Sequence, residues 1–205
     1  MSLITDEHID IVKEIVNIGV GKAANLLNHL INENIKLSVP NIYFTNTNEL
    51  PKFLMKYQDV SISVVNLGFK GELSGSCQLL FATDGAKLLV SIFTDEDITD
   101  EDEFNEIRQH TLSEIGNIVL NSLIGTISNI LSQKFLYRTP KYIECSVANF
   151  LSENDIVEVQ DVMLATTRFI IQEANITGEF LLIFETGSMD TLIEKIELVN
   201  QKGTL

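Results

Sequence analysis

The chain has 205 residues, of which 45% are hydrophobic and 21% are charged, and this composition is typical of a globular protein and not of a disordered one. The formal net charge of −15 argues against nucleic acid or an anionic membrane surface as the main partner, because both require a basic footprint. The acidic N-terminus is unlike a signal peptide, and the longest apolar runs are too short to cross a bilayer. We therefore expect a cytoplasmic protein without membrane insertion.

The first half of the chain predicts a long helix, three strands and a closing helix. Apolar residues recur at helical spacing through the long helix, and the strands are marked by runs of β-branched and aromatic residues with short turns between them. Thr5 can cap the long helix, and acidic residues follow in its first turn. The expected elements are a helix from about 6 to 33, strands at 41–46, 60–69 and 75–81, and a short helix near 84–93.

The second half repeats this order. The tetrapeptide ITDE occurs at 4–7 and again at 98–101, in each case at the start of a long helical pattern. Gly75 stands six residues before Phe81, and Gly178 stands six residues before Phe184. The expected elements are a helix from about 100 to 133, a strand at 142–150, a β-rich stretch at 156–172, a strand at 178–184 and a helix near 188–199.

This internal repeat predicts an α+β fold with a pseudo-two-fold axis. Two α-β-β-β-α halves, about 1–97 and 98–205, are expected to share one mostly antiparallel sheet with the long helices on a face. They join near residues 94–99 without a linker rich in Pro, Gly or Ser, so we expect a single fused domain spanning 1–205. Cys77 and Cys145 lie in strand-like apolar surroundings and are expected to be buried free thiols.

Each long helix also carries a polar stripe opposite its apolar face. A glutamate followed three residues later by an asparagine is common on solvated helices, but here the pair recurs in equivalent helices at the same phase. A solvated face has no reason to prefer asparagine in a helix interior. In both copies a proline stands twenty-three residues after the asparagine. The stripes consist of Asp10, Glu14, Asn17, Gly21 and Asn28 in the first helix, and of His110, Glu114, Asn117, Asn121 and Ser128 in the second.

The first copy follows the pattern D-x-x-x-E-x-x-N, then twenty-two residues, then proline, and ends at Pro40. This pattern resembles the signature of the CheC/CheX/FliY family of chemotaxis response-regulator phosphatases. The second copy ends at Pro140 and departs from the pattern only at His110, where the family has Asp or Ser. The resemblance covers essentially the whole chain, and the presence of two intact pairs is most similar to the CheC type.

The resemblance implies a hydrolase of two-component signalling whose substrate is the aspartyl phosphate of a CheY-like response regulator. Asn17 and Asn117 would orient the attacking water, because a carboxamide both donates and accepts a hydrogen bond. Glu14 and Glu114 would anchor a lysine of the regulator. No cofactor or metal is expected in this chain, and the phosphorylated partner would hold the Mg²⁺. The sequence offers no metal-ligand spacing and no Ser/His/Asp set.

The remaining residues of the two motifs are expected to have supporting roles. Asp10, Gly21 and Asn121 would border or support the docking surface, and Pro40 and Pro140 would be structural, each standing before a strand. His110 either supports the second pair or is an exposed helix histidine without a role. We expect both pairs to act.

The sequence leaves other functions open. The main alternative is an adaptor that chiefly binds a CheD-type receptor deamidase and has weak or no phosphatase activity. A scaffold associated with the flagellar motor, and a phosphatase that serves a regulator outside chemotaxis, are further alternatives.

Overall fold

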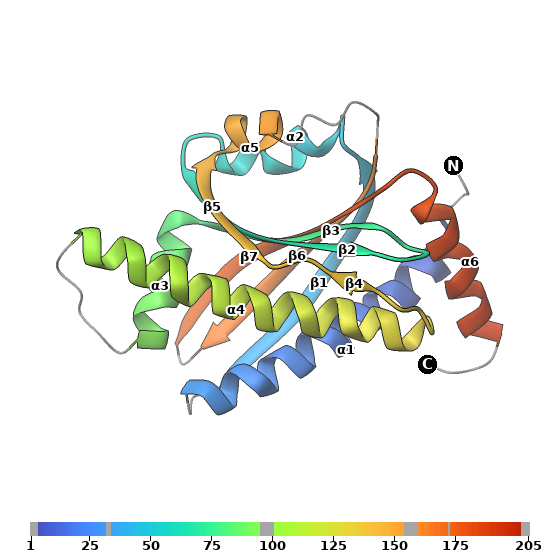
Figure 1. Ribbon diagram of the computed structural model, residues 1–205, viewed down its shortest axis with the longest axis horizontal. Helices are drawn as coiled ribbons and strands as arrows, with labels where there is room; N and C mark the ends of the chain where they lie inside the picture. Colours follow the sequence, from blue (N-terminus) through green and yellow to red (C-terminus); the bar gives the residue numbers. More distant parts are fainter. Residues whose placement is uncertain (1–3, 32–33, 95–100, 154–159, 172, 202–205) are drawn as a thin grey trace.

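The computed structural model describes residues 4–31, 34–94, 101–153, 160–171 and 173–201. It confirms the predicted α+β class: one antiparallel sheet carries long helices on a face (Figure 1). The first half contains α1 (Asp6–Ile31), β1 (Ile35–Asn46), α2 (Leu50–Leu54), η1 (Met55–Tyr57), β2 (Ser61–Lys70), β3 (Gly75–Ala82) and α3 (Thr83–Thr94). The second half contains α4 (Glu101–Ile130), β4 (Leu136–Tyr137), β5 (Lys141–Ser146), α5 (Val147–Glu153), β6 (Asp161–Ile171), β7 (Ala174–Phe184) and α6 (Ser188–Gln201).

The sheet takes its strands from both halves of the chain. Its order is β1-β6-β7-β3-β2, and both β4 and β5 pair with the outer side of β2. Every pairing is antiparallel. Read from either edge, the sheet presents equivalent strands in the same order with the two halves exchanged. The pairing of β3 with β7 joins the halves at the centre, so neither half has a sheet of its own.

Alternation of side chains along the strands divides the core into two layers, one on each face of the sheet. The long helices α1 and α4 lie over one face and share a core with α3 and α6. The short helices α2 and α5 lie over the other face, where they cover a smaller core (Figure 1). No helix in the described part of the chain is long and apolar enough to span a membrane.

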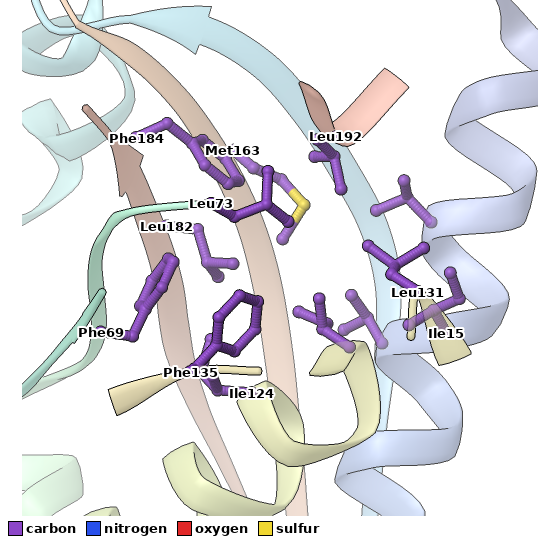
Figure 2. A pocket seen from close by; sticks show the side chains of 13 residues that line it. Ile15, Phe69, Leu73, Ile124, Leu131, Phe135, Met163, Leu182, Phe184 and Leu192 are labelled. Carbon is purple, nitrogen blue, oxygen red and sulfur yellow. The ribbon is translucent and has the colours of Figure 1, made fainter. Parts of the chain in front are cut away.

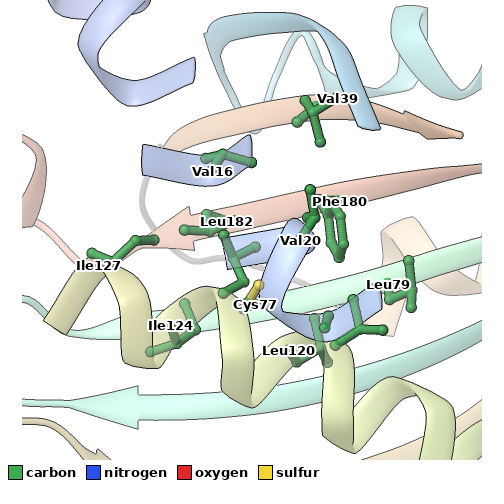
Figure 3. Close-up of a cluster of buried hydrophobic side chains, with 14 of the residues drawn as sticks. Val16, Val20, Val39, Cys77, Leu79, Leu120, Ile124, Ile127, Phe180 and Leu182 are labelled. Carbon is green, nitrogen blue, oxygen red and sulfur yellow. The ribbon is translucent and has the colours of Figure 1, made fainter. Parts of the chain in front are cut away.

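The larger core is filled by the apolar faces of α1 and α4 and by the inward side chains of the central strands (Figure 3). Val20 of α1, Leu120 of α4 and Phe180 of β7 have no solvent exposure. Cys77 also lies here, fully buried, and burial raises the pKa of its thiol far above the ordinary value. Neither cysteine forms a disulfide, as predicted, but Cys145 is only half-buried and not buried.

A small apolar hollow lies within this core between α1, the end of α4 and the sheet (Figure 2). Ile15, Phe69, Phe135 and Leu182 are among the side chains that line it. Its volume is about 20 Å³, hardly more than one water molecule needs, and its walls offer no polar partner for a water. The hollow is therefore a feature of core packing and not a ligand site.

The structure adds two short elements to each predicted half: α2 and η1 in the first, and β4 and α5 in the second. One short helix follows β1 and another follows β5, so apart from η1 and β4 both halves have the order α-β-α-β-β-α, and residues 147–150, predicted as strand, begin α5. The first strand also begins earlier than predicted, at Ile35, which places Pro40 inside β1 and not before it. The junction predicted near 94–99 falls almost entirely on residues 95–100, outside the described ranges, as do residues 156–159 of the predicted β-rich stretch.

Candidate functional site

The two predicted polar stripes lie on the side of α1 and α4 away from the core, and the two copies match position by position in their exposure. Glu14 and Glu114 are exposed, whereas Asn17 and Asn117 are half-buried. In both helices the apolar residues that face the sheet are buried. Their burial fixes the rotation of each helix about its axis and so directs the polar stripe away from the core. The outer positions are also equivalent: Asp10 and His110 are exposed, and Gly21 and Asn121 are half-buried.

The two helices pack closely against each other, so both pairs belong to one surface of the molecule. They come close together at Gly19, where an added Cβ would lie 3.0 Å from the Cα of Leu123. A side chain at this position would therefore push the helices apart. The N-terminal part of each helix is held by a buried residue: His8 Nε2 lies 3.6 Å from a carboxylate oxygen of Glu197 on α6, and Arg108 pairs with Glu144 on β5.

The carboxamide of Asn17 is fully engaged with backbone groups. Its Oδ1 accepts a hydrogen bond from the backbone N–H of Val39 at 3.0 Å. Its Nδ2 donates to the carbonyl of Lys13 at 2.9 Å and, more weakly, to the carbonyl of Val39 at 3.4 Å. Asn17 therefore ties α1 to β1.

The contact with Val39 explains the fixed spacing between asparagine and proline in the first copy. Pro40 follows Val39, and the register of β1 on β6 shifts between Ser38 and Asn41. Proline cannot donate to the sheet, so it is tolerated at such an irregularity on an edge strand. The side chain of Asn17 supplies partners to the backbone that the irregularity leaves without them. This role of the Val39 backbone was missed from the sequence, although the repeated spacing was a signal of it.

Asn117 has a different environment. Its Oδ1 accepts a hydrogen bond from Nδ2 of Asn121 at 2.5 Å, one turn further along α4. Within the described ranges its own Nδ2 has no hydrogen-bond partner, so this amide group is available to a ligand. Gly21 occupies the position equivalent to Asn121 and has no side chain that could hold Asn17 in the same way. Asn121 thus holds the carboxamide of Asn117 in place, and the Nδ2 of Asn117 can still donate hydrogen bonds to a ligand.

The other predicted residues lie close to the pairs. Asp10 and His110 each stand one turn before the glutamate of their helix. Neither side chain has a hydrogen-bond partner among the residues that the structure describes. Pro140 immediately precedes β5, as predicted. Among the described residues there is no group of three or more His, Cys, Asp or Glu that could hold a metal ion.

The site can therefore do limited but definite chemistry. Each helix presents a solvated carboxylate, able to bind a cation of a partner, three residues before a carboxamide. The carboxamide of Asn117 has a free Nδ2 among the described residues and can hold a water molecule, whereas that of Asn17 could do so only if its bonds to the backbone opened. The described part of the site contains no activated nucleophile beside them. Such a surface needs a partner that brings an already reactive group.

Comparison with known proteins confirms the resemblance expected from the sequence. Residues 7–43, which span most of α1 and the first part of β1, match the model of the CheC-like family. The CheY-P phosphatase CheC of Bacillus subtilis (strain 168) is 26% identical over 162 residues, which are 78% of this chain and 76% of that protein.

Solved structures show the same fold. The crystal structure of Thermotoga maritima FliY matches with a TM-score of 0.74 at 20% identity, over 97% of this chain and 100% of that chain. A chain in the CheX–CheY–BeF3–Mg²⁺ complex from Borrelia burgdorferi matches with a TM-score of 0.52 at 18% identity, over 84% of this chain and 99% of that one.

Proposed function

We propose that this chain, in which residues 7–43 match the model of the CheC-like family, is a phosphatase that hydrolyses the aspartyl phosphate of a CheY-like response regulator. The observation that carries the proposal is the repeated surface on α1 and α4. An exposed glutamate and a half-buried asparagine occur twice, one hundred positions apart, with equal burial and equal orientation to the core. A B. subtilis relative that carries the name of such a phosphatase supports the substrate class.

In the proposed reaction a water molecule attacks phosphorus in line with the bond to the aspartyl oxygen. That bond breaks, and inorganic phosphate and the free carboxylate are released. Asn117, and Asn17 where its bonds to β1 open, would hold the water through a carboxamide that donates one hydrogen bond and accepts another. The carboxamide would speed the reaction by holding a water molecule in the orientation for attack, which a water molecule of bulk solvent only rarely has.

Glu14 and Glu114 would contribute by docking the partner. An exposed carboxylate one turn before the carboxamide can pair with a lysine near the phosphoryl group and so set the register of the two proteins. The regulator would bring the Mg²⁺ that offsets charge in the transition state, and the proposed roles of this chain's residues require no metal ligand from it. The rate at which the regulator loses phosphate tests this without a structure of the complex.

The experiment that tests the function is a turnover assay. The phosphorylated regulator is mixed with a tenth of its concentration of this chain in the presence of Mg²⁺, and loss of phosphate is followed over time. We expect the whole regulator pool to lose phosphate faster than it does alone. Binding of the regulator without faster loss of phosphate would contradict the proposal, and binding of a CheD-type deamidase in that case would favour the adaptor function.

A further inference from the structure

Asn121 lies on α4 one turn after Asn117 and belongs to the polar stripe of the second pair. Its side chain is half-buried, and its Nδ2 donates to Oδ1 of Asn117 at 2.5 Å. This is the one hydrogen bond that the side chain of Asn121 forms with the residues that the structure describes. Within these residues, Asn121 therefore supports only a carboxamide to which the proposed reaction assigns a part.

Two half-buried asparagines of the first helix support the fold instead. Oδ1 of Asn17 accepts from the backbone N–H of Val39 at 3.0 Å, and Oδ1 of Asn28 accepts from the backbone N–H of Ile35 at 2.6 Å. Both carboxamides thus join α1 to β1. In the described part of the chain Asn121 forms no such bond from α4 to a strand. Asparagine is also a poor helix former, so the stability of α4 does not account for it either.

The bond from Asn121 distinguishes the two ends of the Asn117 carboxamide. Oδ1 takes one hydrogen bond and keeps a second lone pair, while both N–H groups of Nδ2 are unpaired among the described residues. A donor at Asn121 therefore favours the orientation in which Nδ2 is presented to a ligand. A carboxamide that is ordered in this way before the partner binds loses less side-chain freedom on binding.

The first pair has no equivalent of this support. Gly21 stands at the position of Asn121, and a Cβ added to Gly21 would meet no atom within 4 Å. The described part of the chain thus leaves room for a side chain at this place on both helices, and only α4 has one. The two pairs differ here for a reason other than packing of the core.

We propose that Asn121 is a positioning residue of the second pair, which orders the carboxamide of Asn117 with its Nδ2 toward the bound phosphoryl group. The inference rests on the phosphatase function proposed above and adds to it a residue that does not touch the substrate. Docking is assigned to Glu114 and not to Asn121. Loss of Asn121 should therefore lower kcat and leave KM almost unchanged.

The test measures kcat and KM for dephosphorylation of the regulator in a chain that carries Asn17→Ala, so that the second pair carries the reaction. Asn121→Ala should lower kcat about fivefold, the effect of one neutral hydrogen bond, and should leave KM within about twofold. Asn121→Gln keeps an amide that can reach a residue four positions back on a helix, and it should restore most of the rate.

Asn121→Asp tests the orientation of the Asn117 carboxamide. A carboxylate can only accept, so it would bind Nδ2 of Asn117 and turn Oδ1 toward the partner. We expect this variant to lose more of kcat than Asn121→Ala. Asn129→Asp makes the same change of charge at an exposed position three turns after Asn117 on the same helix, and it should leave kcat within about twofold.

A second measurement gives the orientation without catalysis. NMR measures how fast the side-chain amide protons exchange with solvent in the wild-type chain without the regulator. We expect the amide protons of Asn117 to exchange as fast as those of the exposed Asn129, and one amide proton of Asn121 to exchange more slowly. In Asn121→Asp the slow exchange should instead be found at Asn117.

Three results would overturn the proposal. The first is a kcat for Asn121→Ala within about twofold of that of the parent chain. The second is an equal loss of kcat in Asn121→Asp and Asn129→Asp, which would indicate a general charge effect. The third is slow exchange of the Asn117 amide protons in the wild-type chain, which would reverse the orientation. Absence of turnover by the wild-type chain would contradict the phosphatase function itself, and the exchange rates would still show which end of the Asn117 carboxamide is held.

Discussion

Replacing Asn117 by alanine is expected to slow dephosphorylation of the regulator more than replacing Asn17 by alanine. The amide Nδ2 of Asn117 is unpaired in the described part of the chain and its Oδ1 is steadied by Asn121, so this carboxamide can take up a water at once. Asn17 must first give up its bonds to Val39 and Lys13. Loss of one positioned hydrogen-bonding group costs an enzyme about a hundredfold, so Asn117→Ala should lower the rate about tenfold or more, to the level that the first pair sustains.

The stability of the same two variants should change in the reverse order. Asn17→Ala leaves the backbone of Val39 without its partners and should lower the free energy of unfolding by about 1–2 kcal/mol. Asn117→Ala removes only a contact with a neighbouring side chain and should cost less than about 0.5 kcal/mol. Denaturant unfolding shows which variant loses more stability, and initial rates from the turnover assay show which loses more activity. Equal effects in both measurements would show that the two copies are equivalent.

The second large effect is expected on the other face of the sheet, at Glu179. Glu179 is 1% exposed on the central strand β7, where Lys56 pairs with its carboxylate and the hydroxyl of Tyr57 lies 3.4 Å away. Burial and the adjacent carboxylate raise the pKa of Tyr57 far above its ordinary value, so its hydroxyl keeps its proton as a donor. Lys56→Met leaves a buried charge without its cation and should lower the free energy of unfolding by about 3 kcal/mol.

Two further variants test this explanation. The double variant Lys56→Met/Glu179→Leu removes both charges and should recover most of the lost stability, because the desolvated carboxylate is gone. Lys52→Met removes a lysine from the neighbouring exposed pair with Glu49 and should cost less than about 0.5 kcal/mol. Chemical denaturation gives all three values. A double variant no more stable than Lys56→Met would show that packing of the lysine stem, and not charge, held η1 on the sheet.

The sequence predicted the parts of the fold that depend on periodicity. The α1 and α4 patterns are long and repeat apolar residues at helical spacing, so their phase and the exposure of Glu14 and Glu114 followed from the spacing alone. The antiparallel sheet followed from short strands joined by turns. The short helices α2 and α5 were missed because five to seven residues are too few to show a helical period, and residues 147–150 follow directly on the strand-like residues 142–146.

Part of the difference between the two copies was not predictable, since it depends on a tertiary contact. The sequence shows Asp10 against His110, leaves the role of His110 open and predicts that both pairs act. The structure instead places the difference at Gly21 and Asn121, which decide whether a neighbour on the same helix can hold the carboxamide. The bond from Asn17 to Val39 spans twenty-two positions and needs the irregularity of β1 beside Pro40. No local pattern reports such a contact.

The measurement that tests the central proposal most directly is the rate of regulator dephosphorylation with the double variant Asn17→Ala/Asn117→Ala. Wild-type chain, both single variants and the double variant are compared at the same substoichiometric concentration with Mg²⁺, and circular dichroism checks that each is folded. We predict that the double variant, although folded and still able to bind the regulator through Glu14 and Glu114, returns the rate to that of the regulator alone. A folded double variant that retains wild-type activity would contradict the assignment of the two carboxamides as the groups that position the water.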